Sequence, residues 1–86
     1  MDRKERIRTV LRVEKISQAE MEDKAGLKKY QLRNALKGTG VLNEKIMDAV
    51  ISKVPEYEDW IMTGREHPEE GQISPMTKKT GEELGA

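Results

Sequence analysis

Residues 17–38, SQAEMEDKAGLKKYQLRNALKG, constrain the fold more than any other part of the chain. They open with Ser17 and Glu20, which have the spacing of a capping box, where each side chain bonds a free backbone N–H of the other residue. A helix is therefore expected to begin at Gln18. It cannot run far, because Gly26 supplies the permissive backbone that the turn at the end of a helix requires.

A second helix is expected after this short turn, from Lys28 to about Lys37, closed by Gly38. At 100° per residue its side chains divide into an apolar side and a polar side. The apolar side holds Leu32, Ala35 and Leu36, and the opposite side holds Tyr30, Arg33, Asn34 and Lys37. An aromatic ring, a guanidinium, an amide and an ammonium on one side of a helix are the groups that read base edges and phosphates in a major groove.

Two lysines stand where this second helix begins. The helix macrodipole disfavours positive charge at Lys28 and Lys29 by roughly 0.3 to 1 kcal/mol. A docked polyanion would offset that cost.

The charge of the chain is unevenly distributed. The net charge of the 86 residues is zero, which alone argues against a nucleic-acid binder. Residues 1–40, however, carry 11 Lys/Arg against 6 Asp/Glu, and residues 41–86 carry 5 against 10. This asymmetry is typical of a binding face and a solvating tail. Two solvated helix surfaces of opposite sign would produce the same pattern.

Three more helices are expected around this pair, so the sequence predicts an all-α fold with five short helices. They run from Arg3 to about Glu14, from an N-cap at Asn43, and from Pro55 to Gly64. Their apolar faces are Ile7, Val10 and Leu11; Met47, Val50, Ile51 and Val54; and Tyr57, Trp60 and Ile61. Arg6, Arg8 and Arg12 lie off the first stripe, and one of them is a candidate phosphate contact.

The chain divides into a domain over residues 1–64 and a tail over residues 65–86. The tail has no hydrophobic period, two prolines and many charges, so we expect it to be largely disordered, flexible and acidic to polar. His67, the only histidine, lies there and is not expected to be held against a partner. Glu69 and Glu70 beside it are interpreted as solvated charge rather than metal ligands.

Several functions lack the residues they need. Without cysteine there is neither a disulfide nor a thiolate metal site. The loop at residues 38–40 lacks the lysine and the preceding strand of a phosphate loop. No apolar run approaches the roughly 20 residues of a membrane span. We therefore expect a cytoplasmic protein that is not an enzyme, with no cofactor, metal, membrane contact or small-molecule ligand.

Several short motifs resemble the lambda-repressor-like (Cro/repressor, XRE) helix-turn-helix regulators. They are Ile16-Ser17-Gln18, Lys24-Ala25-Gly26, Leu32 and Gly38, and Asp59-Trp60-Ile61-Met62-Thr63-Gly64. The resemblance covers roughly residues 3–64 and implies a five-helix domain that binds operator DNA and regulates transcription, usually as a repressor. The compact size and the tail look similar to small prophage-type regulators.

The candidate DNA-binding residues follow from the outward side chains and from this resemblance. They are Gln18, Lys28, Lys29, Tyr30, Gln31, Arg33, Asn34 and Lys37. Arg33 and Asn34 are expected to carry sequence specificity, since a guanidinium matches guanine and an amide matches adenine. The resemblance implies a phosphate contact for Gln18, and Lys28 and Lys37 are likewise assigned to phosphates.

Two positions depart from the usual pattern of the family. Glu22 stands where a small residue such as Ala is usual, and Lys28 stands where a Ser or Thr cap is usual. We therefore expect disturbed packing between the two helices and a poorly capped second helix.

A homodimer on an operator with an inverted repeat is expected, because one such helix covers too few base pairs to select a site. Val41, Tyr57 and Ile61 are the candidate interface, with Ile73 and Met76 as possible contributors. The alternative from another class is a protein-interaction module or antitoxin-type regulator whose acidic second half docks a partner protein.

Overall fold

The computed structural model describes residues 1–78, and their regular structure is helical apart from one isolated bridge between His67 and Gln72. The α-helices are α1 (Arg3–Val13), α2 (Gln18–Lys24), α3 (Gln31–Leu36), α4 (Glu44–Ile51) and α5 (Glu58–Thr63). Two 3₁₀ turns, η1 (Pro55–Tyr57) and η2 (Pro68–Glu70), precede and follow α5, and residues 75–78 form a further helical turn. The prediction of an all-α fold is confirmed over these residues.

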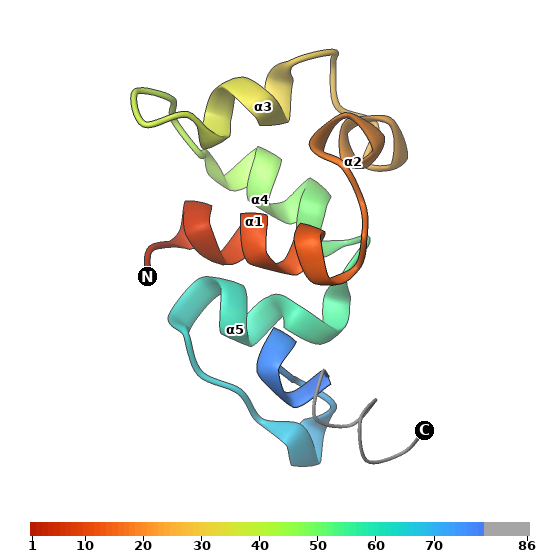
Figure 1. Cartoon of the computed structure of the whole chain (residues 1–86), viewed down its shortest axis with the longest axis vertical. Coiled ribbons are helices and arrows are strands. Elements are labelled where there is room, and N and C mark those ends of the chain that lie inside the picture. Colours follow the sequence, from red (N-terminus) through yellow and green to blue (C-terminus); the bar gives the residue numbers. More distant parts are fainter. Residues whose placement is uncertain (79–86) are drawn as a thin grey trace.

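Helix α1 runs through the middle of the molecule (Figure 1). Helices α2 and α3 lie at one end and pack on each other, and α5 packs along the opposite side of α1. The α2–α3 pair is thus held at one end of the molecule, away from the segment that follows α5.

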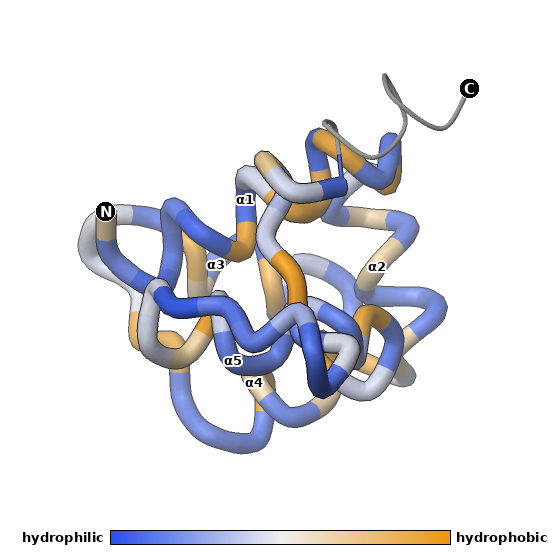
Figure 2. Tube along the Cα trace, turned by 90° about the horizontal axis from the view of Figure 1, so that it is seen from below, coloured by the Kyte–Doolittle hydropathy of each residue, from blue (hydrophilic) through white to orange (hydrophobic). Residues whose placement is uncertain are grey.

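The core is built from the amphipathic faces that the sequence predicts. The α1 stripe of Ile7, Val10 and Leu11 is buried, and so is the predicted face of α4 and its following turn. Short hydrophilic and hydrophobic stretches follow one another along the tube in Figure 2, as expected for amphipathic helices. Asn43 caps α4 through a 2.8 Å hydrogen bond from the backbone N–H of Ile46, as predicted.

The fifth predicted helix begins as a 3₁₀ turn and becomes an α-helix only at Glu58. Gly64 ends it in a left-handed conformation with φ of 78°, which glycine adopts without steric cost. Trp60 is partly buried against the core, as predicted.

The prediction of a disordered segment from Arg65 onward is wrong for residues 65–78, which fold back onto the domain. The Gln72 side chain donates to the carbonyl of Pro55 and accepts from the backbone N–H of Asp59, both at 2.9 Å. The backbone N–H of Ile73 donates to the carbonyl of Glu56 at 2.8 Å. A few polar groups thus attach this segment to the domain by hydrogen bonds. Because the segment has no hydrophobic period, its composition gave no sign of this attachment and led to the prediction of disorder. Residues 79–86, the remainder of the predicted tail, lie outside the described residues.

Further contacts fix the end of this segment. Lys78 forms a 2.7 Å ion pair with Glu14 at the end of α1. The carboxylate of Glu66 accepts hydrogen bonds from the backbone N–H of Ser74 and from the Thr77 hydroxyl. These bonds hold the pKa of Glu66 below its ordinary value, the Thr77 bond most strongly.

Among the described residues, no helix combines the length and apolar composition needed to cross a membrane.

Candidate nucleic-acid interface

Helix α2 begins as its capping box predicts. The Ser17 hydroxyl accepts from the backbone N–H of Glu20 at 3.0 Å, and the Glu20 carboxylate accepts from the backbone N–H of Ser17 at 3.3 Å. Gln18, the candidate phosphate contact, is the first residue of the helix and is half-buried. Gly26 makes the following turn in the left-handed region, with φ of 69°.

Helix α3 begins at Gln31, three residues later than predicted, and ends at Leu36. Tyr30 takes the N-cap position in the left-handed region, with φ of 68°, and its side chain makes no cap hydrogen bond. The Gln31 side chain accepts from the backbone N–H of Lys28 at 2.9 Å, which draws the preceding residues into a turn. Lys28 and Lys29 therefore precede the helix, and Lys37 follows it.

The predicted division of α3 into two sides is confirmed at the buried positions. Leu32, Ala35 and Leu36 are in the core. Tyr30 is 49% exposed, and Asn34 and Lys37 are exposed.

The N-terminal end of α3 is capped from the neighbouring helix. Glu22 of α2 is only 3% exposed, and its carboxylate accepts from the backbone N–H groups of Tyr30, Leu32 and Arg33 at 3.0 to 3.1 Å. These are N–H groups that the first turn of a helix leaves without intrahelical partners. The expectation of a poorly capped helix is therefore wrong, because the cap comes from a residue eight positions before Tyr30.

Arg33 completes this arrangement. Its Nε and Nη2 both donate to Oε1 of Glu22, at 3.1 and 2.7 Å. The guanidinium lies over the Tyr30 ring, 4.0 Å from the ring centroid, and the Lys29 ammonium lies 5.1 Å from the same centroid. The expectation of disturbed packing at Glu22 is also wrong, since α2 and α3 pack on each other around this ion pair.

The electrostatics agree with this geometry. The Arg33 hydrogen bond, together with those from the backbone, lowers the pKa of Glu22 to about 2, although burial alone would raise it. The same hydrogen bond raises the pKa of Arg33. Both side chains are therefore charged at neutral pH.

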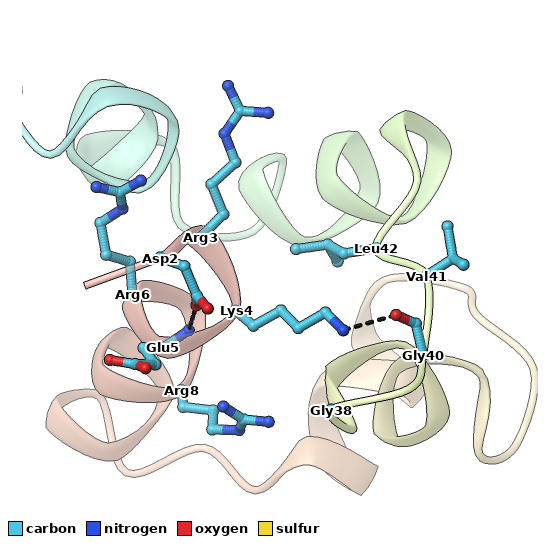
Figure 3. Close-up of a pocket in the computed structure, with 10 residues that line it drawn as sticks. All are labelled: Asp2, Arg3, Lys4, Glu5, Arg6, Arg8, Gly38, Gly40, Val41 and Leu42. Atoms are coloured by element: carbon cyan, nitrogen blue, oxygen red, sulfur yellow. Dashed lines mark hydrogen bonds between the residues drawn. The ribbon is translucent and has the colours of Figure 1, made fainter.

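The C-terminal end of α3 is held from α1. Lys4 donates to the carbonyl oxygens of Lys37 and Gly40, at 2.7 and 2.6 Å, and Arg8 donates to the carbonyl of Leu36. Figure 3 shows Lys4 reaching across to the loop after α3, over an open pocket of about 790 Å³ between this loop and the start of α1. Arg8, a candidate phosphate contact, therefore serves to bind α3.

Two other arginines of α1, Arg3 and Arg6, lie against the C-terminal end of α5. Arg3 Nε donates to the carbonyl of Met62 at 3.1 Å. The Arg6 guanidinium lies so close to Gly64 that a Cβ added there would be 2.7 Å from its Nη1. Of the three candidate phosphate contacts in α1, Arg6 and Arg8 are half-buried and only Arg12 is exposed.

The loop after α3 lies so close to the helix that a side chain at position 40 would force the loop to move. A Cβ added at Gly40 would lie 1.9 Å from the backbone oxygen of Asn34 and 2.9 Å from that of Ala35. A Cβ added at Gly38 would meet nothing within 4 Å.

The predicted dimer interface needs correction at two of its three residues. Tyr57 of η1 and Ile61 of α5 are 0% exposed, because both side chains pack in the core of the same chain. Val41, in the loop between α3 and α4, is 75% exposed. Only Val41 of the three therefore lies where a second subunit could contact it. Ile73 is partly buried against the core, and Met76 is exposed.

The prediction that His67 is not held against a partner is also wrong. Its Nδ1 lies 2.9 Å from Oδ2 of Asp59, because η2 folds back beside the start of α5. Asp59, His67 and Glu70 have possible metal-ligand atoms within 4.8 Å of one another, and the side chains of Asp59 and His67 are partly exposed. The interpretation that this segment holds no metal stays a prediction.

No protein-family model matches the chain, and no curated protein matches it in sequence. Its fold and the side chains around α3 are therefore the basis for any assignment of function.

Proposed function

We propose that this protein is a sequence-specific DNA-binding regulator of transcription, most simply a repressor, that places α3 in the major groove of an operator. The observation that carries the proposal is how α3 is held in the domain. One side of the helix is buried, both ends are tied to other helices, and the remaining side presents Tyr30 and Asn34 to solvent. A rigidly held helix with an exposed polar side is what major-groove reading requires.

The charges around that side support the same function. Lys28, Lys29 and Lys37 are all exposed, and no carboxylate within residues 1–78 forms an ion pair with them. Such lysines suit phosphates on either side of a groove. Gln18, at the start of α2, is assigned to a phosphate by the resemblance to lambda-repressor-like regulators, whose five-helix domain we propose for this chain.

We further propose a homodimer on an inverted repeat, with Val41 in the contact between subunits. Two copies of α3 would then read half-sites about one helical turn apart. The regulator would act in the cytoplasm, without catalysis and without a cofactor.

Salt-dependent binding to DNA tests the proposal. Duplexes enriched from a random pool should bind at least 100-fold more tightly than unrelated duplexes, and affinity should fall steeply with salt. Lys37→Gln should weaken binding to all sequences and reduce the salt slope by about one counterion. Lys53→Gln, an exposed lysine between α4 and η1, is the matched control and should change neither quantity. If no duplex is enriched and binding does not depend on salt, the proposal is wrong and a protein partner becomes the better assignment.

A further inference from the structure

We propose that Glu22 fixes Arg33 in the orientation that reads a guanine: it holds the Nε side of the guanidinium and leaves the Nη1 and Nη2 edge for the base. This inference rests on the proposed DNA-binding function and concerns its specificity. Glu22 is a positioning residue, because its buried side chain acts on the base only through Arg33.

The guanidinium of Arg33 has two edges that can each donate a pair of parallel hydrogen bonds. One edge carries Nε–H and one hydrogen of Nη2, and the other carries one hydrogen each of Nη1 and Nη2. Glu22 takes the first edge, since its Oε1 accepts from Nε at 3.1 Å and from Nη2 at 2.7 Å. The second edge makes no hydrogen bond within residues 1–78. The ion pair therefore leaves one complete fork for a ligand.

The position of Arg33 in α3 suits the reading of a base. It is the third residue of the helix, and 30% of its side chain is exposed. The recognition helix of a helix-turn-helix contacts base edges with its N-terminal residues. Two parallel donors match O6 and N7 of guanine, the one base that offers two acceptors in the major groove.

Several contacts keep the guanidinium in place. Its Cζ lies over the Tyr30 ring, 4.0 Å from the ring centroid, and the Lys29 ammonium lies 5.1 Å from the same centroid. Glu22 is itself fixed, because its carboxylate also accepts from the backbone N–H groups of Leu32 and Arg33. A long side chain that is already ordered loses less conformational entropy on binding. Arg33 can thus pair with guanine while the buried carboxylate keeps its partner.

Selection of binding sites from a random duplex pool, followed by base substitution, tests the reading of guanine. The wild-type site should contain a guanine in each half-site. Exchange of that base for 7-deazaguanine, which has C–H in place of N7, should weaken wild-type binding roughly tenfold. The same exchange should have no effect on binding by Arg33→Met. Asn34→Ala, a change at an exposed neighbour, should keep the full effect.

Glu22→Gln tests the positioning role, at a temperature where circular dichroism shows that the variant is folded. Gln keeps the shape of the side chain, but its neutral amide holds a guanidinium more weakly than a carboxylate does. The effect of 7-deazaguanine should shrink to about twofold, while the preferences at other base positions persist. Asp23→Asn makes the same change of charge at an exposed position and should keep the tenfold effect.

A further measurement uses only the wild-type protein, and it decides the question if Glu22→Gln does not fold. The NMR signal of the Arg33 Nε–H should be protected from exchange with water in the free protein. It should stay protected in the complex with the selected duplex, because the bond to Glu22 persists. Loss of protection on binding would show that Arg33 leaves Glu22 to reach the DNA, and would overturn the inference.

The outcomes distinguish the two claims. The positioning role is wrong, while DNA binding stands, if every guanine of the selected site tolerates the exchange or if the effect persists in Arg33→Met. It is also wrong if folded Glu22→Gln keeps the tenfold effect or loses its preference at all positions equally. If the pool yields no enriched sequence, the DNA-binding function itself is wrong, and the inference falls with it.

Discussion

The two ends of α3 are both held by side chains of other helices, and those side chains carry opposite charges. Glu22 of α2 accepts from backbone N–H groups at the N-terminal end, and Lys4 and Arg8 of α1 donate to carbonyls at the C-terminal end. Each charge has the sign that the helix macrodipole favours at its end. A helix of six residues is too short to be stable alone, so these contacts define its position.

The two ends differ in their access to water. The Glu22 side chain is almost completely buried, whereas Lys4 and Arg8 are half-buried. Water can replace a lost lysine at the C-terminal end, but the bond from the backbone N–H of Leu32 to Glu22 is buried, and water reaches it only if the contact between α2 and α3 opens. The N-terminal end should therefore be the more sensitive one.

Glu22→Gln should have the largest effect on stability. It keeps the shape of the side chain but removes the charge that Arg33 and three backbone donors bind, at a cost of about 3 kcal/mol in the free energy of unfolding. Urea unfolding of both proteins measures the difference. Asp23→Asn, an exposed neighbour in α2, is the control and should change stability by less than about 0.5 kcal/mol. Equal effects of the two substitutions would contradict the account of the cap.

The contribution of Glu22 should also depend on pH. Its pKa is about 2 in the folded protein and 4.5 as its ordinary value, so its charge stabilises the fold fully above pH 4.5. That stabilisation should decline as the pH falls from 4.5 toward 2 and be absent below both values. The measurement is the gap in unfolding free energy between wild type and Glu22→Gln at a series of pH values. A gap that stays constant from neutral pH down to pH 2 would show that the carboxylate charge is not responsible.

Gly40→Ala tests how closely the following loop approaches the C-terminal end of α3. The added Cβ would collide with the backbone oxygen of Asn34, so the loop must move, at a cost of about 2 kcal/mol. Gly38→Ala is the matched control, because its Cβ meets no atom within 4 Å. It should be neutral or stabilise by up to about 1 kcal/mol. Thermal unfolding of the pair distinguishes them, and similar melting temperatures would mean that the close approach does not exist in solution.

Lys4→Met should have the smallest effect of the three test substitutions. It keeps the apolar stem but removes the bonds to the carbonyls of Lys37 and Gly40, which solvent can partly replace. A loss of about 1 kcal/mol is expected, less than for Glu22→Gln. Lys53→Met provides the baseline for an exposed lysine. If Lys4→Met destabilised the protein more than Glu22→Gln, the order proposed for the two ends would be reversed.

Local patterns sufficed to predict much of the fold. The capping box at Ser17, the N-cap at Asn43 and the turn at Gly26 each depend on residues within four positions, so their spacing in the sequence determines the structure. The buried faces of α1, α3 and α4 follow from helical periodicity in the same way.

Features that depend on distant partners were not predicted. Glu22 caps a helix that begins nine residues later, and Gln72 anchors a segment to residues more than ten positions away. The residues next to Glu22 and Gln72 in the sequence give no indication of these contacts. Periodicity likewise predicted that Tyr57 and Ile61 share an apolar face, but it cannot distinguish a face packed within the chain from one that meets a second subunit. The left-handed backbone of Tyr30, which shortens α3, has no local signal in the sequence either.

The central claim is that the exposed side of α3 contacts DNA, and an NMR titration of the protein with a selected duplex tests it most directly. Backbone amide signals of residues 28–37 and of Gln18 should shift on binding. The signals of α4 and η1, which belong to the acidic second half of the chain, should stay in place apart from changes due to dimer contact near Val41. Shifts concentrated in residues 44–59, or no shifts at a saturating concentration of the duplex, would contradict the claim.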